Sequence, residues 1–519
     1  MSDISNDTDP EDFYKGSQER ELLGHPIGLA ICFLTEMWER FSYYGMRTIL
    51  VLYLVKYHLY SAGEASMIYG AYAGLVYMMP IIGGYMADRY LGSRKAVTFG
   101  ALLLVAGHTL MGFHGPASFM DGDTIVRNDT YINIFFLAMA LIITGVGFLK
   151  ANISTIVGAL YGPNDPRRDG GFSIFYMGIN LGSLFATALV GYVGEVHGWN
   201  YGFGLAGIGM LFGLLVFLWG QKYLDGRAEP KNPAILKEKS PIGLNKEYTI
   251  YLFGFALVGV SWLFIQNQKL VGQFLGVSGF VMIGLILVYA FMNFTKIERE
   301  RIMVALFLIA VQSVFWALFE QQAASLTLLA DQQFNLDVMG LTFLASQVQL
   351  LNPLFIVVLA PVMAWLWVVL ARKHMEPSTP AKFGIAMLLI GLGYIVFAWG
   401  MGLEDGNSKS FMWLVFIYLS LTVAELCLSP VGLSMVTKLS VTKIVGMMMG
   451  TWFLFSALGN YVAGWISSLT GSGEHGAAGQ LDVVATMDVY TTIGYASVGV
   501  GVVIFILTPL LRKGMHGVH

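Results

Sequence analysis

Residues 27–57 read IGLAICFLTEMWERFSYYGMRTILVLYLVKY, an apolar run with four charged side chains well inside it. The run is longer than the roughly 20 apolar residues that cross a bilayer as one helix. A charge at the bilayer centre costs about 2.5–3.5 kcal/mol on insertion scales, so each such residue needs a partner or a function. The stretch therefore predicts a transmembrane helix with one face turned away from lipid.

The rest of the chain repeats the apolar pattern. Hydrophobic residues make up 56% of the 519 positions and charged residues 12%, whereas soluble domains are about 25% charged. We expect fourteen spans near residues 27–57, 65–87, 95–115, 131–160, 171–193, 202–221, 248–265, 271–293, 302–330, 338–371, 381–402, 411–437, 443–468 and 488–511. The fold class is an all-α membrane protein. A net charge of -3 and scattered basic residues indicate no nucleic-acid partner.

The division into domains follows from the longest polar stretch, which carries three prolines between the sixth and seventh spans. A weak likeness between residues 94–100 and 380–384, which open the third and eleventh runs, suggests two similar halves. Two runs have no counterpart in either half and are interpreted as an inserted hairpin. The predicted parts are a tail at 1–26, a six-helix bundle at 27–221, a linker at 222–247, the hairpin at 248–293, a second six-helix bundle at 294–512 and a tail at 513–519.

Orientation is predicted from the lysines and arginines of the short loops. Counted from an inner N-terminus, the inner loops hold most of them and the outer loops only Arg127, Lys269 and Lys409. The acidic first 26 residues lack the basic start and apolar core of a cleaved signal peptide. Both termini are therefore expected in the cytoplasm.

The charges of the first span share one helical face. Glu39 and Arg40 follow Glu36 by three and four residues, and Arg47 follows Arg40 by seven. These are the spacings of neighbours on a helix surface. Tyr43 and Tyr44 extend this face, which we expect to line a wet cavity. The alternative is a packing seam in which Glu36 and Arg40 neutralise each other.

Three further charges lie inside later spans, at Lys150, Glu320 and Glu425. With about 1.5 Å of rise per residue, Arg47 and Glu320 each lie about 16 Å from the outer ends of their spans. Lys150 and Glu425 lie about 18 and 20 Å from the inner ends. We expect two ion pairs between the halves, Arg47 with Glu320 closing the outer side and Lys150 with Glu425 the inner side. Alternatively, carbonyls and water satisfy each charge locally.

Several motifs resemble one known family. Residues 36–45, EMWERFSYYG, match the ExxERFxYYG motif of the proton-coupled oligopeptide transporter family. Residues 175–184, FYMGINLGSL, resemble its FYxxINxGSL signature, and residues 84–92, GYMADRYLG, resemble a loop motif of the wider major facilitator superfamily. The likeness extends to Phe319-Glu320-Gln321, Asn352-Pro353 and residues 425–430, ELCLSP, and so covers essentially the whole chain.

The resemblance implies a major facilitator fold of two six-helix bundles, with the inserted two-helix hairpin of the bacterial branch, in the inner membrane. It further implies a symporter that imports di- and tripeptides with protons as the coupling ion, and peptide-like drugs are candidate further substrates. No other cofactor, no metal and no enzymatic activity are expected, and the monomer is expected to be functional. Glu36, Glu39 and Arg40 would couple proton to substrate, with Glu320 as first candidate for the proton carrier.

Peptide ends would then be held by opposite charges. Arg40, Arg47 and Lys150 suit a carboxylate, and Glu425 suits an ammonium. By resemblance, Asn180 and Asn352 would hydrogen-bond the peptide, and five aromatic residues would contact its side chains, namely Tyr43, Tyr44, Tyr77, Trp316 and Trp452. Ser429 precedes Pro430, which could soften its helix or simply kink it for packing.

Other functions stay open at this point. The same scaffold could carry another solute, such as nitrate or a peptide-like drug, although Glu425 would then be superfluous. A channel or sensor could use the buried charges without moving cargo, and a membrane enzyme would need a nucleophile with an adjacent base, which does not stand out.

Overall fold

The computed structural model describes residues 20–162, 165–230, 232–338, 340–404, 406, 408–471 and 480–518, and it is built almost entirely of helices. Fourteen long helices occur in this part of the chain: α2 Ile27–Lys56, α3 Ala62–Met86, α4 Ser93–Met111, α5 Asp129–Ala159, α6 Arg168–Tyr192, α7 Trp199–Gly220, α9 Lys246–Gln266, α10 Gln268–Asn293, α11 Lys296–Phe319, α13 Leu351–Arg372, α14 Thr379–Met401, α15 Phe411–Leu439, α16 Val445–Ser468 and α17 Val483–Gly514. Eleven helical stretches are long and apolar enough to cross a membrane by themselves. The all-α membrane fold is confirmed.

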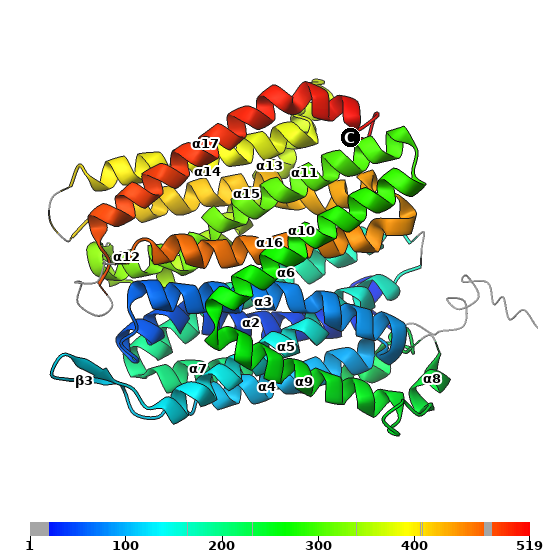
Figure 1. Ribbon diagram of the computed structural model, residues 1–519, viewed down its shortest axis with the longest axis horizontal. Helices are drawn as coiled ribbons and strands as arrows, with labels where there is room; N and C mark the ends of the chain where they lie inside the picture. Colours follow the sequence, from blue (N-terminus) through cyan, green and yellow to red (C-terminus); the bar gives the residue numbers. More distant parts are fainter. Residues whose placement is uncertain are drawn as a thin grey trace, which may run out of the picture.

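The helices run roughly side by side and fall into two packed groups (Figure 1). In the first, which we call the N-terminal bundle, α2 packs on α6 and α7, and α4 packs on α5 and α7. In the C-terminal bundle, α14 packs on α15 and α17, and α11 packs on α16. The exact boundaries predicted for the domains stay predictions.

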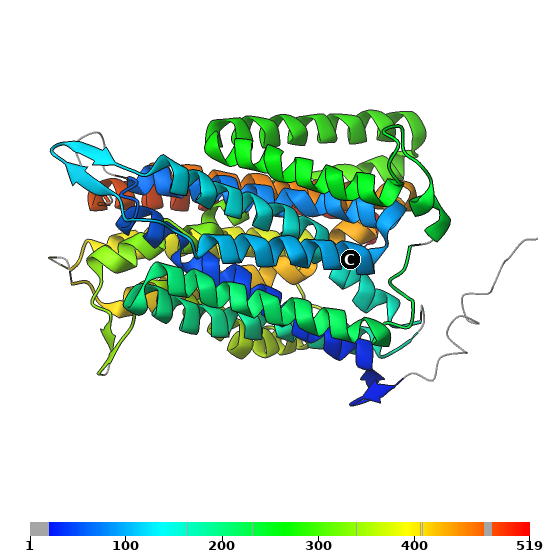
Figure 2. The ribbon, with the colours of Figure 1, turned by 90° about the horizontal axis from the view of Figure 1, so that it is seen from below.

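Two ends of the molecule serve as landmarks. The strands β3 Phe119–Asp121 and β4 Thr124–Val126 form a hairpin between α4 and α5, and we call their side the β-hairpin end. At the opposite side, the terminus end, lie the strands β1 Glu21–Leu22 and β2 His25–Pro26, the short helix α8 Pro233–Lys237 and the last turn of α17 (Figures 1 and 2).

The bundles touch along α3 and α16. A Cβ atom added at Gly464 would lie 2.5 Å from the carbonyl oxygen of Ser66 and 2.6 Å from the Cα atom of Gly70. These distances are shorter than a side chain tolerates, so only glycine permits the backbones to approach so closely.

The inserted pair α9 and α10 lies along one side of the molecule (Figure 2). Its two helices contact different bundles, because α9 packs on α5 and α10 packs mainly on α16. At the terminus end, Lys95 of α4 and Glu247 of α9 form an ion pair of 2.7 Å between Nζ and Oε1. Helices α9 and α10 together thus link the two bundles.

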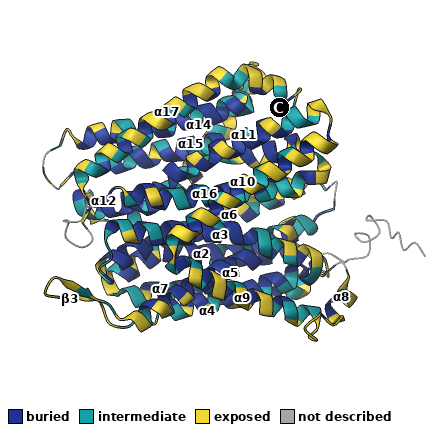
Figure 3. Cartoon of the chain, in the orientation of Figure 1, coloured by how far each residue is buried: buried dark blue, intermediate teal, exposed yellow. Residues whose placement is uncertain are grey.

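Burial follows the expected membrane pattern. Buried residues gather in the middle of each bundle, and exposed ones lie on its outside (Figure 3). The outer helices α10, α13 and α17 carry large exposed apolar side chains, such as Phe280, Trp365 and Ile506. Exposed apolar surface of this extent requires lipid rather than water.

The ninth predicted span is not one straight helix. After Phe319, α11 tightens into the 3₁₀ turn η4 Glu320–Ala323, and α12 Ser325–Gln333 continues toward the β-hairpin end. The Gln321 amide nitrogen donates to the carbonyl oxygens of Ala317 and Ala463, at 2.9 and 3.0 Å. The bond to Ala317 supplies a donor to a carbonyl beside the break in the helix, and the bond to Ala463 ties the turn to α16. The break places Glu320 at the inner surface of the bundle.

Candidate functional site

Three charged residues of α2 contact one another. The Arg40 Nε atom lies 3.1 Å from Glu36 Oε1 and also donates to Glu39, and all three side chains are buried. The contact between Glu36 and Arg40 that the packing-seam alternative needs is therefore present. However, Glu36 Oε2, Glu39 Oε1 and Arg40 Nη2 have no partner among the described residues. The cluster retains hydrogen-bonding capacity that packing alone does not use.

Arg47 reaches across to the other bundle. Its Nη2 atom lies 2.5 Å from Glu320 Oε2, and the hydroxyl of Tyr69 donates to the same oxygen at 2.9 Å. The guanidinium also lies over the ring of Tyr44, 5.6 Å from its centroid. The structure thus brings together Arg47 and Glu320, which were predicted to pair from their similar distances to the outer ends of their spans.

Lys150 and Glu425 are not paired here. No ion pair joins them in the described part of the chain, and the Lys150 ammonium lies 4.3 Å from the ring centroid of Tyr77. Glu425 Oε2 instead accepts a hydrogen bond of 3.1 Å from the amide of Asn352, which also donates to Thr422. The second pair predicted from the sequence is therefore absent from this conformation.

A central cavity of about 140 Å³ lies between the two bundles. Eight of the predicted residues line it, namely Tyr44, Arg47, Tyr77, Asn180, Trp316, Glu320, Asn352 and Glu425. The N-terminal bundle contributes the cation Arg47, and the C-terminal bundle contributes the carboxylates Glu320 and Glu425. The cavity therefore has walls of opposite charge.

The other predicted residues lie elsewhere. Glu36, Glu39 and Arg40 are behind the cavity wall, where the Arg40 guanidinium lies 5.2 Å from the ring centroid of Tyr43. Trp452 packs inside the C-terminal bundle against Gly432 of α15. The described lining of the cavity does not include Lys150, Ser429 or Tyr43, although the Lys150 ammonium lies beside the lining residue Tyr77.

Several lining residues were missed by sequence reasoning. They are Tyr176, Ile179, Ser183, Thr187, Phe319, Gln322, Gln349, Pro353 and Ile356. A signal existed on α6, because positions 176, 180, 183 and 187 fall on one helical face. Asn180, which was identified, could have led to the other three.

The cavity is closed on one side. At the β-hairpin end, Lys56 of α2 pairs with Asp331 of α12 at 2.6 Å, and the Thr48 hydroxyl donates to the Ser346 carbonyl at 2.9 Å. The backbone N–H of Ser346 in turn donates to Glu195 at 3.0 Å. By contrast, Tyr176, the α6 lining residue nearest the terminus end, is 53% exposed. The cavity is thus reached from the terminus end.

Comparisons with known proteins agree with one another. Residues 94–481 match the model of the POT family. A peptide transporter of Yersinia enterocolitica is 36% identical over 521 residues, covering 95% of this chain and 96% of the relative. A di-/tripeptide transporter of Lactococcus lactis is 34% identical over 529 residues, covering 96% and 99%.

The fold agrees as well. A solved variant of a POT peptide transporter in complex with alafosfalin has a TM-score of 0.83 and 35% identity, over 98% of this chain and 100% of that chain. A POT transporter in complex with 5-aminolevulinic acid has a TM-score of 0.80 and 30% identity, over 95% and 98%. These likenesses confirm the predicted major facilitator architecture, and the chain belongs to the POT family of transporters.

Proposed function

We propose that the protein is a proton-coupled symporter that imports di- and tripeptides by alternating access. The observation that carries this proposal is the central cavity with Arg47 on one bundle and Glu425 on the other. A short peptide is a zwitterion whose carboxylate and ammonium are held apart by its backbone. A site with opposite charges on opposite bundles suits both ends, and a bound peptide would draw the bundles together. The named substrates of the relatives support the same class of solute.

The peptide carboxylate is assigned to Arg47 and, on closure, Lys150. The Arg47 guanidinium can bind a carboxylate through two parallel hydrogen bonds, and in this structure Glu320 occupies it. The ammonium is assigned to Glu425, which lines the cavity beside Asn352. Tyr44, Tyr77 and Trp316 would contact the varied peptide side chains. Arg40, which lies outside the cavity wall, keeps only its proposed part in proton coupling.

Proton coupling is assigned to Glu320 and the cluster of Glu36, Glu39 and Arg40. When the peptide carboxylate takes Arg47, Glu320, which is 2% exposed, loses its cationic partner. An unpaired buried carboxylate is costly, and a proton on Glu320 removes that cost. Peptide and proton would therefore bind together, which is the requirement for symport.

Two alternating ion pairs would gate the cavity. Arg47 and Glu320, which are paired here, would hold the β-hairpin end closed. Approach of Lys150 to Glu425 would close the terminus end and release the other pair. The many lysines and arginines at the terminus end favour a cytoplasmic orientation for it, so this conformation would face the cytoplasm of a bacterial inner membrane. Because one chain lines the whole cavity, we propose that the monomer transports.

Uptake into proteoliposomes tests the proposal. The purified protein is reconstituted, and entry of a labelled dipeptide is followed with and without an inward proton gradient, with and without a protonophore. We expect accumulation above equilibrium only with the gradient. A dipeptide that is acetylated at its amine and amidated at its carboxylate serves as control and should not compete. Accumulation that ignores the gradient would contradict proton coupling, and no uptake of any di- or tripeptide would contradict the substrate class.

A further inference from the structure

A second, larger cavity lies within the C-terminal bundle at the terminus end. Its volume is about 680 Å³, within the range of sites that hold small organic molecules. It shares no described lining residue with the central cavity. Its walls are the last turns of α13, α15 and α17, the first turn of α14, and the loop between α13 and α14. We call it the terminal cavity.

The terminal cavity lies at the level of a membrane surface. Ala371, Leu439 and Arg512 belong to the final turns of three spans, and Thr379 opens a fourth. Helices that cross a bilayer end where the hydrocarbon gives way to lipid headgroups. A molecule in this cavity would therefore sit beside the headgroup layer, with access from water and from lipid.

Positive charge dominates the terminal cavity. Lys382, Lys438 and Arg512 line it together with His374, and Glu376 is the single carboxylate among its described lining residues. That carboxylate is already used, because its Oε1 atom lies 2.6 Å from Lys382 Nζ. Arg512, in contrast, forms no ion pair with any described residue. Arg512 therefore has no described carboxylate as its partner in the cavity, and an anion would balance its charge.

The position of Lys382 strengthens this reading. Its side chain is 10% exposed, and its ammonium also lies 4.6 Å from the ring centroid of Trp367. A lysine that only needed to reach water at a helix end would extend into solvent. Lys382 is instead held in place by Glu376 and Trp367, so its charge is positioned before any ligand arrives.

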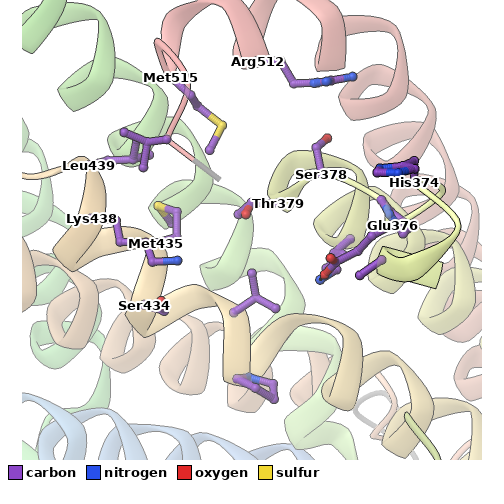
Figure 4. Close-up of a pocket in the computed structure, with 16 residues that line it drawn as sticks. His374, Glu376, Ser378, Thr379, Ser434, Met435, Lys438, Leu439, Arg512 and Met515 are labelled. Atoms are coloured by element: carbon purple, nitrogen blue, oxygen red, sulfur yellow. Dashed lines mark hydrogen bonds and ion pairs between the residues drawn. The ribbon is translucent and has the colours of Figure 1, made fainter. Parts of the chain in front are cut away.

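The remaining wall is divided between hydroxyls and apolar groups. Ser378, Thr379 and Ser434 offer hydroxyl donors, and Met435, Leu439 and Met515 form an apolar surface (Figure 4). Val431 adds to this apolar surface. Guanidinium, ammonium and hydroxyl groups together suit the oxygens of a phosphate. An apolar wall beside them suits the glycerol and first methylene groups of a lipid.

We propose that the terminal cavity binds a phosphate group, carried either by an acidic phospholipid at the headgroup level or by a soluble phosphate ester. The cavity joins the part of α15 that follows Pro430 to α14 and α17. A bound phosphate would bridge these helices and so stabilise the C-terminal bundle. This binding is independent of the substrate and coupling ion assigned to the central cavity.

Thermal unfolding of the full protein in detergent micelles tests the proposal. The melting temperature is measured during titration with phosphatidylglycerol, phosphatidylcholine, inorganic phosphate or glycerol 3-phosphate. A ligand that binds only the folded state raises the melting temperature with its concentration. We expect a saturable increase with phosphatidylglycerol and little with phosphatidylcholine. An increase with glycerol 3-phosphate as well would identify the soluble ester as a second source of the same phosphate chemistry.

Arg512→Gln is the decisive variant, and Lys513→Gln is its matched control. The two residues are neighbours in the last turn of α17, but only Arg512 lines the cavity. The apparent Kd for phosphatidylglycerol should weaken at least tenfold in Arg512→Gln and stay within twofold in Lys513→Gln. Equal weakening in both variants, or equal effects of both lipids on the unaltered protein, would overturn the proposal.

A second variant covers the case in which Arg512→Gln folds poorly. Ser434→Phe keeps every charge but fills the cavity from an exposed position on α15. We expect it to reduce the effect of phosphatidylglycerol as strongly as the loss of Arg512. An unchanged lipid effect in Ser434→Phe would show that the phosphate binds elsewhere on the surface.

Discussion

Arg47 and Glu320 lie 273 positions apart in the sequence, and their Nη2 and Oε2 atoms lie 2.5 Å apart between the two bundles. The contact is buried and carries a third member, the hydroxyl of Tyr69, which donates to the same carboxylate oxygen. Arg47 also faces the central cavity. The ion pair that joins the bundles is therefore within reach of any solute that enters.

Exchanging the two charges tests whether the pair itself matters. Arg47→Glu or Glu320→Arg alone should abolish peptide uptake, because each leaves like charges in contact, and disrupting a buried pair costs about 3–5 kcal/mol. The double exchange restores opposite charges and should recover part of the uptake by proteoliposomes. Thermal unfolding of all three variants shows whether each still folds. No recovery in a folded double variant would contradict a gating role for the pair.

Neutralising Glu320 separates coupling from binding. Glu320→Gln keeps the shape of the side chain but cannot lose or gain a proton in the physiological range. We expect proton-driven accumulation to disappear while exchange of internal for external peptide continues. Counterflow with equal pH on both sides provides the matched measurement. Accumulation that persists in Glu320→Gln would assign the proton to another group, such as Glu39 or Glu36.

Glu425→Gln addresses recognition of the peptide amine. The amide can still bond to Asn352 but loses its charge, and a hydrogen bond to a charged group contributes about 1.5–3 kcal/mol. The half-inhibitory concentration of an unmodified dipeptide should rise about tenfold or more. A dipeptide acetylated at its amine should show a much smaller change between the two proteins. Equal changes for both peptides would contradict an ammonium site at Glu425.

Gly464→Ala probes closure at the β-hairpin end. The new methyl group would collide with the backbone of Ser66 and Gly70, and overpacking typically costs about 1–3 kcal/mol. The bundles should separate at this end, which spin-label distances between α5 and the end of α16 would detect. Gly446→Ala on the same helix is the control, because nothing lies within 4 Å of its added carbon. Identical distances in both variants would contradict tight packing at Gly464.

The buried loop residue His58 should make the stability of the protein depend on pH. Burial lowers the pKa of His58 to about 4, with smaller contributions from His114 and Arg127. An unfolded histidine has a pKa of about 6.5, so between these values the unfolded chain binds the additional proton. Stability should therefore fall, by up to about 3 kcal/mol, as pH drops from about 6.5 to about 4.

Replacing His58 isolates its contribution. In His58→Gln the melting temperature should depend less steeply on pH over this range, because the titrating group is gone. His197→Gln, at an exposed position, should keep the slope of the unaltered protein. A slope in His58→Gln equal to that of the unaltered protein would exclude His58 as its cause.

Much of the fold follows from the sequence alone. Fourteen apolar runs correspond to the long helices α2 to α17 because a lipid solvent forces every spanning segment to satisfy its own backbone bonds as a helix. The charged face of α2 could be recognised in the same way, since helical spacing is a local property. Because a charge in lipid is costly, these side chains must face away from lipid whatever other helices surround them.

Contacts between helices depended on the tertiary structure. The distance of each residue from the end of its span predicted two ion pairs, Arg47 with Glu320 and Lys150 with Glu425. Only the first pair is formed in the described part of the chain. Helix rotation directs Lys150 onto Tyr77, and Glu425 is hydrogen-bonded to Asn352 instead. The same reasoning explains Trp452, which has the right residue type for a pocket but points into its own bundle.

The sequence by itself determined that this chain is a bundle of membrane helices with charges that lipid does not tolerate. Only the tertiary structure decided which of those charges meet, which side of the central cavity is closed, and that a second, basic cavity lies at the ends of four spans. Hydropathy is summed along the chain, whereas a cavity is made by side chains hundreds of positions apart, so its walls exist only after the helices have packed.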